Sequence, residues 1–255
     1  EALERLWRTV FHKVWAQWRY ENDLPDVDPP PWASRASAEG ASPRRLDGDS
    51  GELLLFCGGG KDSLVSMKLF ERGDVPFASL AYASSVYGSA RPQLDRIDGL
   101  LDEGASRRRH RMIVLDDFFD APVLALYGER LGVRSVTAAE TPSSVFGAVP
   151  ILLARGYPSA VLGNEASANT GNLVWAKTGE EVNHQWGKSV AAERLLDEYI
   201  RSQLCEDTGI FSVLMPLHDV AIFSLLRRDP RALARAHSCN VQKPWCRRCA
   251  KCAYV

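Results

Sequence analysis

A buried strand that runs into three glycines and then into a helix is the feature that most constrains this fold. Residues 53–57 are apolar, residues 58–60 are all glycine, and residues 64–72 have a helical pattern. Glycine lacks a Cβ atom, so backbone amides can approach a ligand closely, and the next helix directs its N-terminal amides to the same point. The pattern predicts an anion-binding loop. The alternative is a glycine-rich turn without a ligand.

Two familiar phosphate-binding loops do not fit this segment. The loop of nucleoside triphosphatases needs Gly-x-x-x-x-Gly-Lys-Ser/Thr, but Lys61 is followed by Asp62 and position 55 is Leu. The dinucleotide fingerprint needs a third glycine where Ser63 stands. Both classes are therefore excluded as the explanation of the loop.

Short apolar runs alternate with helical stretches from residue 52 onwards. This alternation predicts an α/β fold with a doubly wound, mostly parallel sheet. We expect strands at residues 53–57, 77–83, 112–115, 133–138 and 159–162. We expect helices at residues 2–20, 64–72, 93–102, 121–131, 145–155, 189–204 and 219–236.

Composition changes along the chain predict four parts. Residues 1–20 form an N-terminal helix whose aromatic stripe packs on the main domain, and the proline-rich residues 21–50 form a linker or mobile loop, with an active-site lid as one option. Residues 51–237 form the main α/β domain, and residues 238–255 form a small cysteine-rich module.

The charge balance argues against a nucleic-acid partner. The 255 residues include 31 Lys and Arg and 32 Asp and Glu, which gives a net charge of −1. The basic clusters at residues 107–111 and 247–251 are more typical of solvated faces than of a nucleic-acid site. The chain lacks the roughly 18 consecutive apolar residues of a membrane helix and begins without a signal-peptide pattern. We expect a cytoplasmic protein without a membrane partner; the sequence does not indicate its oligomeric state.

Four of the six cysteines lie within the last seventeen residues, which predicts a metal site rather than a disulfide framework. Their spacing is Cys-x6-Cys-x2-Cys-x2-Cys, and four thiolates suit a structural Zn²⁺ ion. An iron–sulfur cluster, replacement of one cysteine by His237, and free thiols remain alternatives. Cys57 and Cys205 stand apart and are expected to be buried. The expected ligands are Cys239, Cys246, Cys249 and Cys252.

The glycine loop resembles the PP-loop of the ATP pyrophosphatase superfamily, whose signature is Ser-Gly-Gly-x-Asp-Ser. Residues 58–63 match it except that Gly58 replaces the leading serine. The resemblance implies that the loop holds the β- and γ-phosphates of ATP, with Mg²⁺, so that ATP is split into AMP and pyrophosphate. Tyr82 lies within residues 81–85, near the end of the second strand, where the superfamily places adenine, although a packing role fits it at least as well. The implied nucleotide-binding residues are Gly58, Gly59, Gly60, Lys61, Asp62, Ser63 and Tyr82.

Three later segments, residues 163–169, 182–189 and 238–255, extend the resemblance to one family. From about Leu53 to the C-terminus the chain resembles the UDP-N-acetylmuramoyl-L-alanyl-L-glutamate epimerase family and related peptide epimerases. This implies activation of the C-terminal carboxylate of a short peptide as an acyl-adenylate. The type substrate of the family is the UDP-muramoyl dipeptide.

Activation of the carboxylate makes the α-proton removable. Such an epimerase then needs a base that takes this proton and an acid that returns one to the opposite face. Glu165 and His184 are the first candidates: Glu165 follows a strand, where open α/β sheets bind ligands, and His184 lies in a polar stretch. Each of these residues has the alternative role of a satisfied structural polar group. The other candidates are Lys188, His218 and Asp219 for catalysis, and Asn164 and Asn169, with Lys188, for binding substrate or phosphate.

Three other functions share parts of this pattern. An amide- or nitrile-forming synthetase similar to 7-cyano-7-deazaguanine synthase would use the same adenylate but leave the α-proton in place. An RNA-thiolating PP-loop enzyme would need a basic face, against which the net charge counts. A nucleotide-sensing or zinc-bridged module would bind ATP without turnover.

Overall fold

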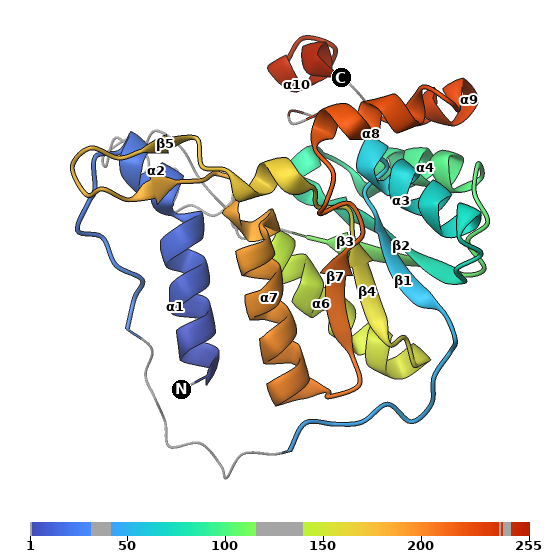
Figure 1. Ribbon diagram of the computed structural model, residues 1–255, viewed down its shortest axis with the longest axis horizontal. Coiled ribbons are helices and arrows are strands. Elements are labelled where there is room, and N and C mark those ends of the chain that lie inside the picture. The colour runs from blue at the N-terminus through green and yellow to red at the C-terminus, as the bar shows by residue number, and fades with distance from the viewer. Residues whose placement is uncertain (1, 32–41, 116–139, 240, 242–245) are drawn as a thin grey trace.

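The computed structural model describes residues 2–31, 42–115, 140–239, 241 and 246–255 of the chain. Five parallel strands form its main sheet in the order β3-β2-β1-β4-β7, which confirms the predicted α/β class (Figure 1). The strands are β1 (Leu53–Cys57), β2 (Phe77–Ser84), β3 (Arg109–Val114), β4 (Ser159–Leu162) and β7 (Gly209–Ser212).

Strand β1 lies at the centre of the sheet because its side chains are apolar on both faces. Leu54 pairs with Ala78 of β2 on one side and with Ala160 of β4 on the other, and all three residues are fully buried. The strand order reverses at this point: β2 and β3 follow on one side of β1, and β4 and β7 on the other. Open α/β sheets bind ligands beside such a reversal, at the carboxyl ends of the strands.

Helices cover both faces of the sheet. One face packs against α3, α4 and α8 through a cluster that includes Leu64, Ile97 and Ile222. The other packs against α1, α6 and α7 through a cluster that includes Leu6 and Leu152. Among the described residues, the helices with eight or more residues are α1 (Ala2–Val14), α3 (Lys61–Arg72), α4 (Ala90–Leu101), α6 (Glu140–Arg155), α7 (Val190–Tyr199) and α8 (Asp219–Leu226).

Several expected boundaries differ from the observed ones. Strand β3 begins at Arg109 rather than at residue 112, because an edge strand keeps its arginines in solvent and needs no continuous apolar run. Strand β7 was not expected; it is an edge strand of only four residues. The expected elements at residues 121–131 and 133–138 lie outside the described residues.

The two C-terminal helical stretches are each divided. The stretch predicted at residues 189–204 comprises α7 and the π-helix Ile200–Leu204. The stretch predicted at residues 219–236 comprises α8 and the short α9 (Pro230–Leu233), which Asp229 caps. A second short pair of strands, β5 (Leu173–Val174) and β6 (Glu181–Val182), is antiparallel.

The N-terminal helix is also divided, into α1 and α2 (Ala16–Glu21). Its aromatic stripe packs on the main domain: the ring centroids of Trp7 and Phe146 lie 5.6 Å apart. Arg19 of α2 is buried, and its guanidinium lies 2.7 Å from the carboxylate of Glu180, beside β6. The N-terminal helices are thereby held to the body of the protein by packing and by a buried ion pair.

Residues 42–50, part of the predicted linker, lie at the amino ends of the strands. The Arg44 amide donates to the carbonyl of Leu204 at 2.9 Å, and the Ser50 amide donates to the carbonyl of Gly156 at 2.8 Å. This segment enters β1 at the amino end of the strand, whereas the glycine loop follows its carboxyl end (Figure 1). These backbone hydrogen bonds attach the segment to the domain, whereas a free linker would lack them.

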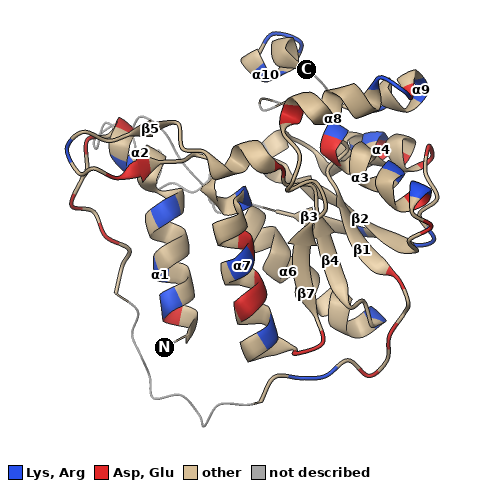
Figure 2. Ribbon diagram, in the orientation of Figure 1, with Lys and Arg blue, Asp and Glu red and all other residues tan. Residues whose placement is uncertain are grey.

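Residues of both charges alternate along several of the described helices, such as α1 and α7 (Figure 2). The basic run at the start of β3 is balanced locally: Arg109 pairs with Asp102 at 2.7 Å and Arg111 with Asp98 at 2.6 Å. Among the described helices, none has the length and apolar character needed to cross a bilayer.

Candidate functional site

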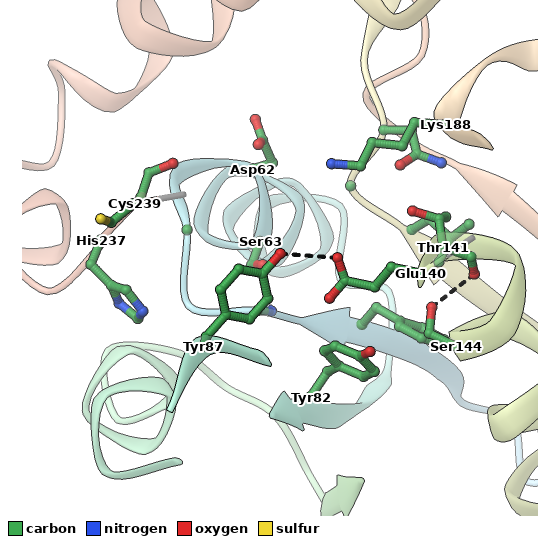
Figure 3. Close-up of a pocket in the computed structure, with 17 residues that line it drawn as sticks. Asp62, Ser63, Tyr82, Tyr87, Glu140, Thr141, Ser144, Lys188, His237 and Cys239 are labelled. Atoms are coloured by element: carbon green, nitrogen blue, oxygen red, sulfur yellow. Dashed lines mark hydrogen bonds between the residues drawn. The ribbon is translucent and has the colours of Figure 1, made fainter. Parts of the chain in front are cut away.

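A cavity of about 270 Å³ opens at the carboxyl ends of β1, β2 and β4, where the strand order reverses (Figure 3). The glycine loop forms one wall through Gly58, Gly60, Asp62 and Ser63. The predicted residues Tyr82, Asn164 and Lys188 also line it. These residues, which were predicted from separate segments of the sequence, lie around one cavity in the structure.

The conformation of the loop explains two of its glycines. Gly59 has φ +79°, and a Cβ atom there would overlap the imidazole carbon Cε1 of His237. A Cβ atom on Gly60 would lie 3.3 Å from the carbonyl oxygen of His237, whose amide donates to the Gly59 carbonyl at 2.9 Å. By contrast, a Cβ atom on Gly58 would meet open space. The position that departs from the PP-loop signature is thus the one with room for a side chain.

Helix α3 starts in the loop without a side-chain cap. Its N-cap residue is Gly60, whose backbone is extended and which has no side chain to accept from the first turn. The hydroxyl of Ser63 accepts from the Gly58 amide at 3.2 Å, which closes the loop on itself. The amides of the first helical turn and the positive end of the helix dipole can therefore serve an anion in the cavity.

Lys61 lies behind the loop rather than in the cavity. Its side chain is 3% exposed, and its ammonium pairs with Asp62 at 2.6 Å and with Asp219. Burial alone would lower the pKa of Lys61, but the two carboxylates outweigh burial and raise it. The two carboxylates therefore favour the charged ammonium, which offsets part of their combined negative charge. Asp219 likewise does not line the cavity.

Asp219 connects the loop to the C-terminal module. Burial opposes ionisation of this carboxyl, but hydrogen bonds from Lys61 and Tyr254 outweigh it and lower the pKa of Asp219. Tyr254 belongs to α10 (Ala250–Tyr254), and its ring lies 5.7 Å from that of Phe223 in α8. Helix α8 therefore lies between the loop and the cysteine-rich module.

The wall facing the loop contains an acidic residue that the sequence reasoning missed. The hydroxyl of Tyr87 donates to Oε2 of Glu140, the first residue of α6, at 3.0 Å (Figure 3). Burial, and then the nearby Glu140 charge, raise the pKa of both Tyr87 and Tyr82, so both phenols stay protonated. Glu140 closely follows the strand predicted at residues 133–138, as Glu165 follows the strand at residues 159–162. That parallel was the available signal.

Glu165 and His184, the first candidates for acid and base, do not line the cavity. The Glu165 carboxylate accepts from the amide of Ser167 at 2.8 Å and from its hydroxyl, and so caps the 3-10 helix Ala166–Asn169. His184 Nδ1 lies 2.6 Å from Oδ1 of Asn172. Burial, and then Lys188 and Lys251, lower the pKa of His184, so it donates from Nδ1 as a neutral imidazole.

Asn164 lines the cavity, whereas Asn169 does not. Asn169 Oδ1 accepts from the amide of Val190 at 2.8 Å, and its Nδ2 donates to the Ala166 carbonyl at 3.1 Å. Its side chain therefore joins the 3-10 helix Ala166–Asn169 to the start of α7. His218 is the N-cap residue of α8 and also lies outside the cavity lining.

The four predicted cysteines meet at one point and could hold a metal ion. All four Sγ atoms lie within 4.8 Å of one another, with separations of 3.4, 3.7 and 3.9 Å between hydrogen-bonded pairs. Amides also donate to the sulfurs, as that of Cys252 does to Cys249 at 3.4 Å. His237 is not a member of this group; it contacts the glycine loop instead. Cys57 and Cys205 are buried, as predicted. The metal group is Cys239, Cys246, Cys249 and Cys252.

Cys239 belongs to the metal group and also lines the cavity, together with His237 and Ser238. The backbone that leads from the glycine loop contact at His237 to the first cysteine therefore forms part of the cavity wall. A metal ion held by the four thiols would fix this wall from behind.

The chain is similar to one family model and to several known proteins. The family model of the MurL N-terminal domain matches residues 136–213. A UDP-N-acetyl-alpha-D-muramoyl-L-alanyl-L-glutamate epimerase from Micromonospora is 34% identical over 275 residues, covering all of this chain and 55% of the relative. The protein of that name from Salinispora tropica is 31% identical over 96% of this chain and 51% of its own length.

Two solved structures show a weaker similarity, with low sequence identity and low TM-scores. The NMN synthetase of Francisella tularensis is 10% identical, with a TM-score of 0.39, over 86% of this chain and 69% of its own. The U34-tRNA thiolase NcsA of Methanococcus maripaludis is 13% identical, with a TM-score of 0.43, over 77% and 61%. The present chain spans about half the length of the curated relatives it matches. The chain is thus similar in sequence to UDP-N-acetyl-alpha-D-muramoyl-L-alanyl-L-glutamate epimerases, and residues 136–213 match the MurL N-terminal domain.

Proposed function

We propose that the protein is an ATP-dependent epimerase that inverts the C-terminal L-glutamate of UDP-N-acetylmuramoyl-L-alanyl-L-glutamate. The observation that carries the proposal is the cavity itself. An uncapped helix N-terminus and an open glycine loop face the same space as Lys188 and Asn164. Relatives of the chain are named for this epimerisation. We infer a cytoplasmic location, because ATP and free thiols are typical of that compartment.

The first step activates the substrate. The terminal carboxylate attacks the α-phosphorus of ATP, pyrophosphate leaves, and a mixed anhydride with AMP forms. The amides of Gly60 and of the first turn of α3 stabilise the leaving pyrophosphate, because they are aimed at the cavity before the substrate arrives. Asp62 faces the same space and is the carboxylate that would hold Mg²⁺, which supplies charge neutralisation on the phosphates.

The second step moves the α-proton. A free carboxylate beside the α-carbon would oppose carbanion formation, whereas the neutral anhydride accepts the charge as an enolate. One group takes the α-proton, another returns a proton to the opposite face, and water then releases AMP and the inverted peptide. Lys188 is the predicted catalytic residue that lines the cavity. Glu165, His184 and Asp219 support this site through the hydrogen bonds and ion pair described above.

We also propose that the four cysteines hold one structural Zn²⁺ ion. Tetrahedral ligation with Zn–S bonds of about 2.3 Å places sulfur atoms about 3.8 Å apart. The separations of 3.4 to 3.9 Å between Cys239, Cys246, Cys249 and Cys252 fit a single ion. Four protein ligands leave no open position, so the ion would stabilise residues 238–255 rather than take part in catalysis.

Deuterium exchange tests the proposed reaction directly. The protein is incubated in D₂O with ATP, Mg²⁺ and UDP-N-acetylmuramoyl-L-alanyl-L-glutamate, and mass spectrometry follows deuterium at the terminal α-carbon while AMP is measured in the same sample. We expect deuterium incorporation that requires ATP and accompanies AMP release. AMP release without incorporation would contradict epimerisation and support an amide-forming synthetase.

A further inference from the structure

Two oppositely charged side chains line the cavity without an ion-pair partner among the described residues. They are Glu140, at the start of α6, and Lys188, the last residue of the 3-10 helix Trp186–Lys188. Asp62 also lines the cavity, but its carboxylate is paired with Lys61 at 2.6 Å. Figure 3 shows the Glu140 carboxylate and the Lys188 amine pointing into the cavity from separate elements. Within the described part of the chain, these two charges are available to a ligand.

The surroundings of Glu140 hold its carboxylate in place. Tyr87 donates to Oε2 at 3.0 Å, and Tyr82, on the adjacent strand end, lies close enough for the Glu140 charge to raise its pKa. The position at the N-terminus of α6 also favours a negative charge, because the helix dipole is positive there. The carboxylate is therefore oriented by hydroxyl donors and not neutralised by a cation.

We propose that Glu140 is the second acid–base residue of the epimerase and works with Lys188 across the α-carbon of the activated glutamate. The inference rests on the proposed function and assigns the acid–base residue that acts opposite Lys188. The Glu140 carboxylate takes the α-proton of the L-epimer, and the electron pair of the C–H bond moves into the enolate. The Lys188 ammonium then gives a proton to the opposite face. Water returns both side chains to their starting protonation states after product release.

The charges of the two groups fit this direction. A carboxylate can accept a proton and an ammonium can donate one, so the pair suits proton removal from the L-epimer and proton delivery to the other face. Two groups on different elements can address two faces of one carbon, which a single group cannot do. Glu165 is less suited to this role, because its carboxylate is held by Ser167 outside the cavity.

Two substitutions are expected to have opposite effects on deuterium incorporation from the L- and D-epimers in D₂O. E140Q is expected to lower deuterium incorporation from the L-epimer at least about 100-fold. The same variant keeps exchange from the D-epimer without inversion, because Lys188 still removes and returns the proton on its own face. K188Q is expected to show the opposite pattern, with exchange from the L-epimer and none from the D-epimer.

Formation of the adenylate is measured separately. ATP–pyrophosphate exchange by E140Q should stay within about threefold of wild type, because the carboxylate acts after activation. E198Q, which changes an exposed carboxylate on α7, is the matched control and should match wild type in both assays. Circular dichroism verifies that each variant is folded.

Three results would overturn the assignment: wild-type exchange of the L-epimer by E140Q, loss of adenylation in parallel with exchange, or loss of exchange from both epimers in both variants. Each is distinct from failure of the proposed function, in which the wild-type protein itself incorporates no deuterium.

Discussion

Lys61, the first residue of α3, and Asp219, the first residue of α8, form an ion pair behind the glycine loop. The lysine is 3% exposed and also contacts Asp62, so two carboxylates share one buried cation. The pair joins the helix that begins in the loop to the helix on which Tyr254 of the cysteine-rich module rests. The loop, α8 and the module are therefore mechanically connected.

Replacing Asp219 with Asn should destabilise the protein by about 2 kcal/mol, because a buried ammonium loses one of its two counter-charges. This loss of stability is smaller than that expected for a buried charge without any counter-charge, because Asp62 still pairs with Lys61. D23N removes the exposed pair with Lys177 and should cost less than about 1 kcal/mol. Urea unfolding of both variants measures the difference. Equal effects of the two substitutions would mean that the buried pair contributes no more than a surface pair.

Substitutions in the glycine loop should have opposite outcomes at neighbouring positions. G59A should cost about 2 kcal/mol or more and abolish ATP binding, because φ is +79° and the new methyl group would overlap His237. G58S places a side chain in open space and restores the superfamily signature, so stability and ATP affinity should be kept. Thermal unfolding and calorimetric titration with ATP measure both effects. Tolerance of G59A would show that the loop and His237 do not pack as described.

Sequence reasoning predicted the loop and the centre of the sheet well, because β1, β2 and β4 are short apolar runs with strong turn signals on either side. It missed β7, whose four residues form an edge strand with little pattern of their own. It also divided neither α1 from α2 nor α8 from α9, since helical periodicity continues across such breaks.

For the site, sequence position identified residues near the cavity but not the direction of their side chains. Lys61 and Ser63 are two residues apart, yet only Ser63 lines the cavity, while Lys61 is paired with Asp219 from a distant helix. Local hydrogen bonds occupy Glu165 and Asn169, and no motif reveals such bonds. Glu140 lies far in sequence from the loop and was found only when the fold brought α6 to the cavity.

Stability should decrease as the pH falls below about 6.5, the ordinary pKa of histidine in the unfolded chain. Burial lowers the pKa of His110, with further lowering by Arg155 and Arg108, so the folded protein binds its proton later than the unfolded chain. Between the two pKa values the unfolded state takes up the proton, and the free energy of unfolding falls. The imidazole Nε2 lies 2.8 Å from the hydroxyl of Tyr157, a contact that the asparagine amide in H110N can imitate.

Comparison of H110N with wild type isolates this contribution from the carboxyl groups that titrate at lower pH. Urea unfolding at pH 7.5 and pH 5.5 should show a smaller decrease for H110N than for wild type. An equal decrease in both proteins would assign the pH dependence to other groups, of which His12 and His184 also have a lowered pKa.

Removal of the proposed Zn²⁺ ion should weaken ATP binding through the backbone that joins Cys239 to the glycine loop. Cys239 is both a member of the metal group and part of the cavity wall, and two residues before it the His237 amide donates to the carbonyl of Gly59 at 2.9 Å. Loss of the ion frees the backbone at Cys239, so this hydrogen bond is no longer held in place.

We expect C249S to lose about one bound Zn²⁺ per chain and to bind ATP about fivefold to tenfold more weakly, the effect of one hydrogen bond. C205A, which removes a buried cysteine outside the metal group, should keep both the ion and the affinity. Metal content by mass spectrometry and ATP titration of the same samples measure the two effects. Full ATP affinity in metal-free C249S would show that the loop is held by α3 and α8 alone and that the module serves another purpose.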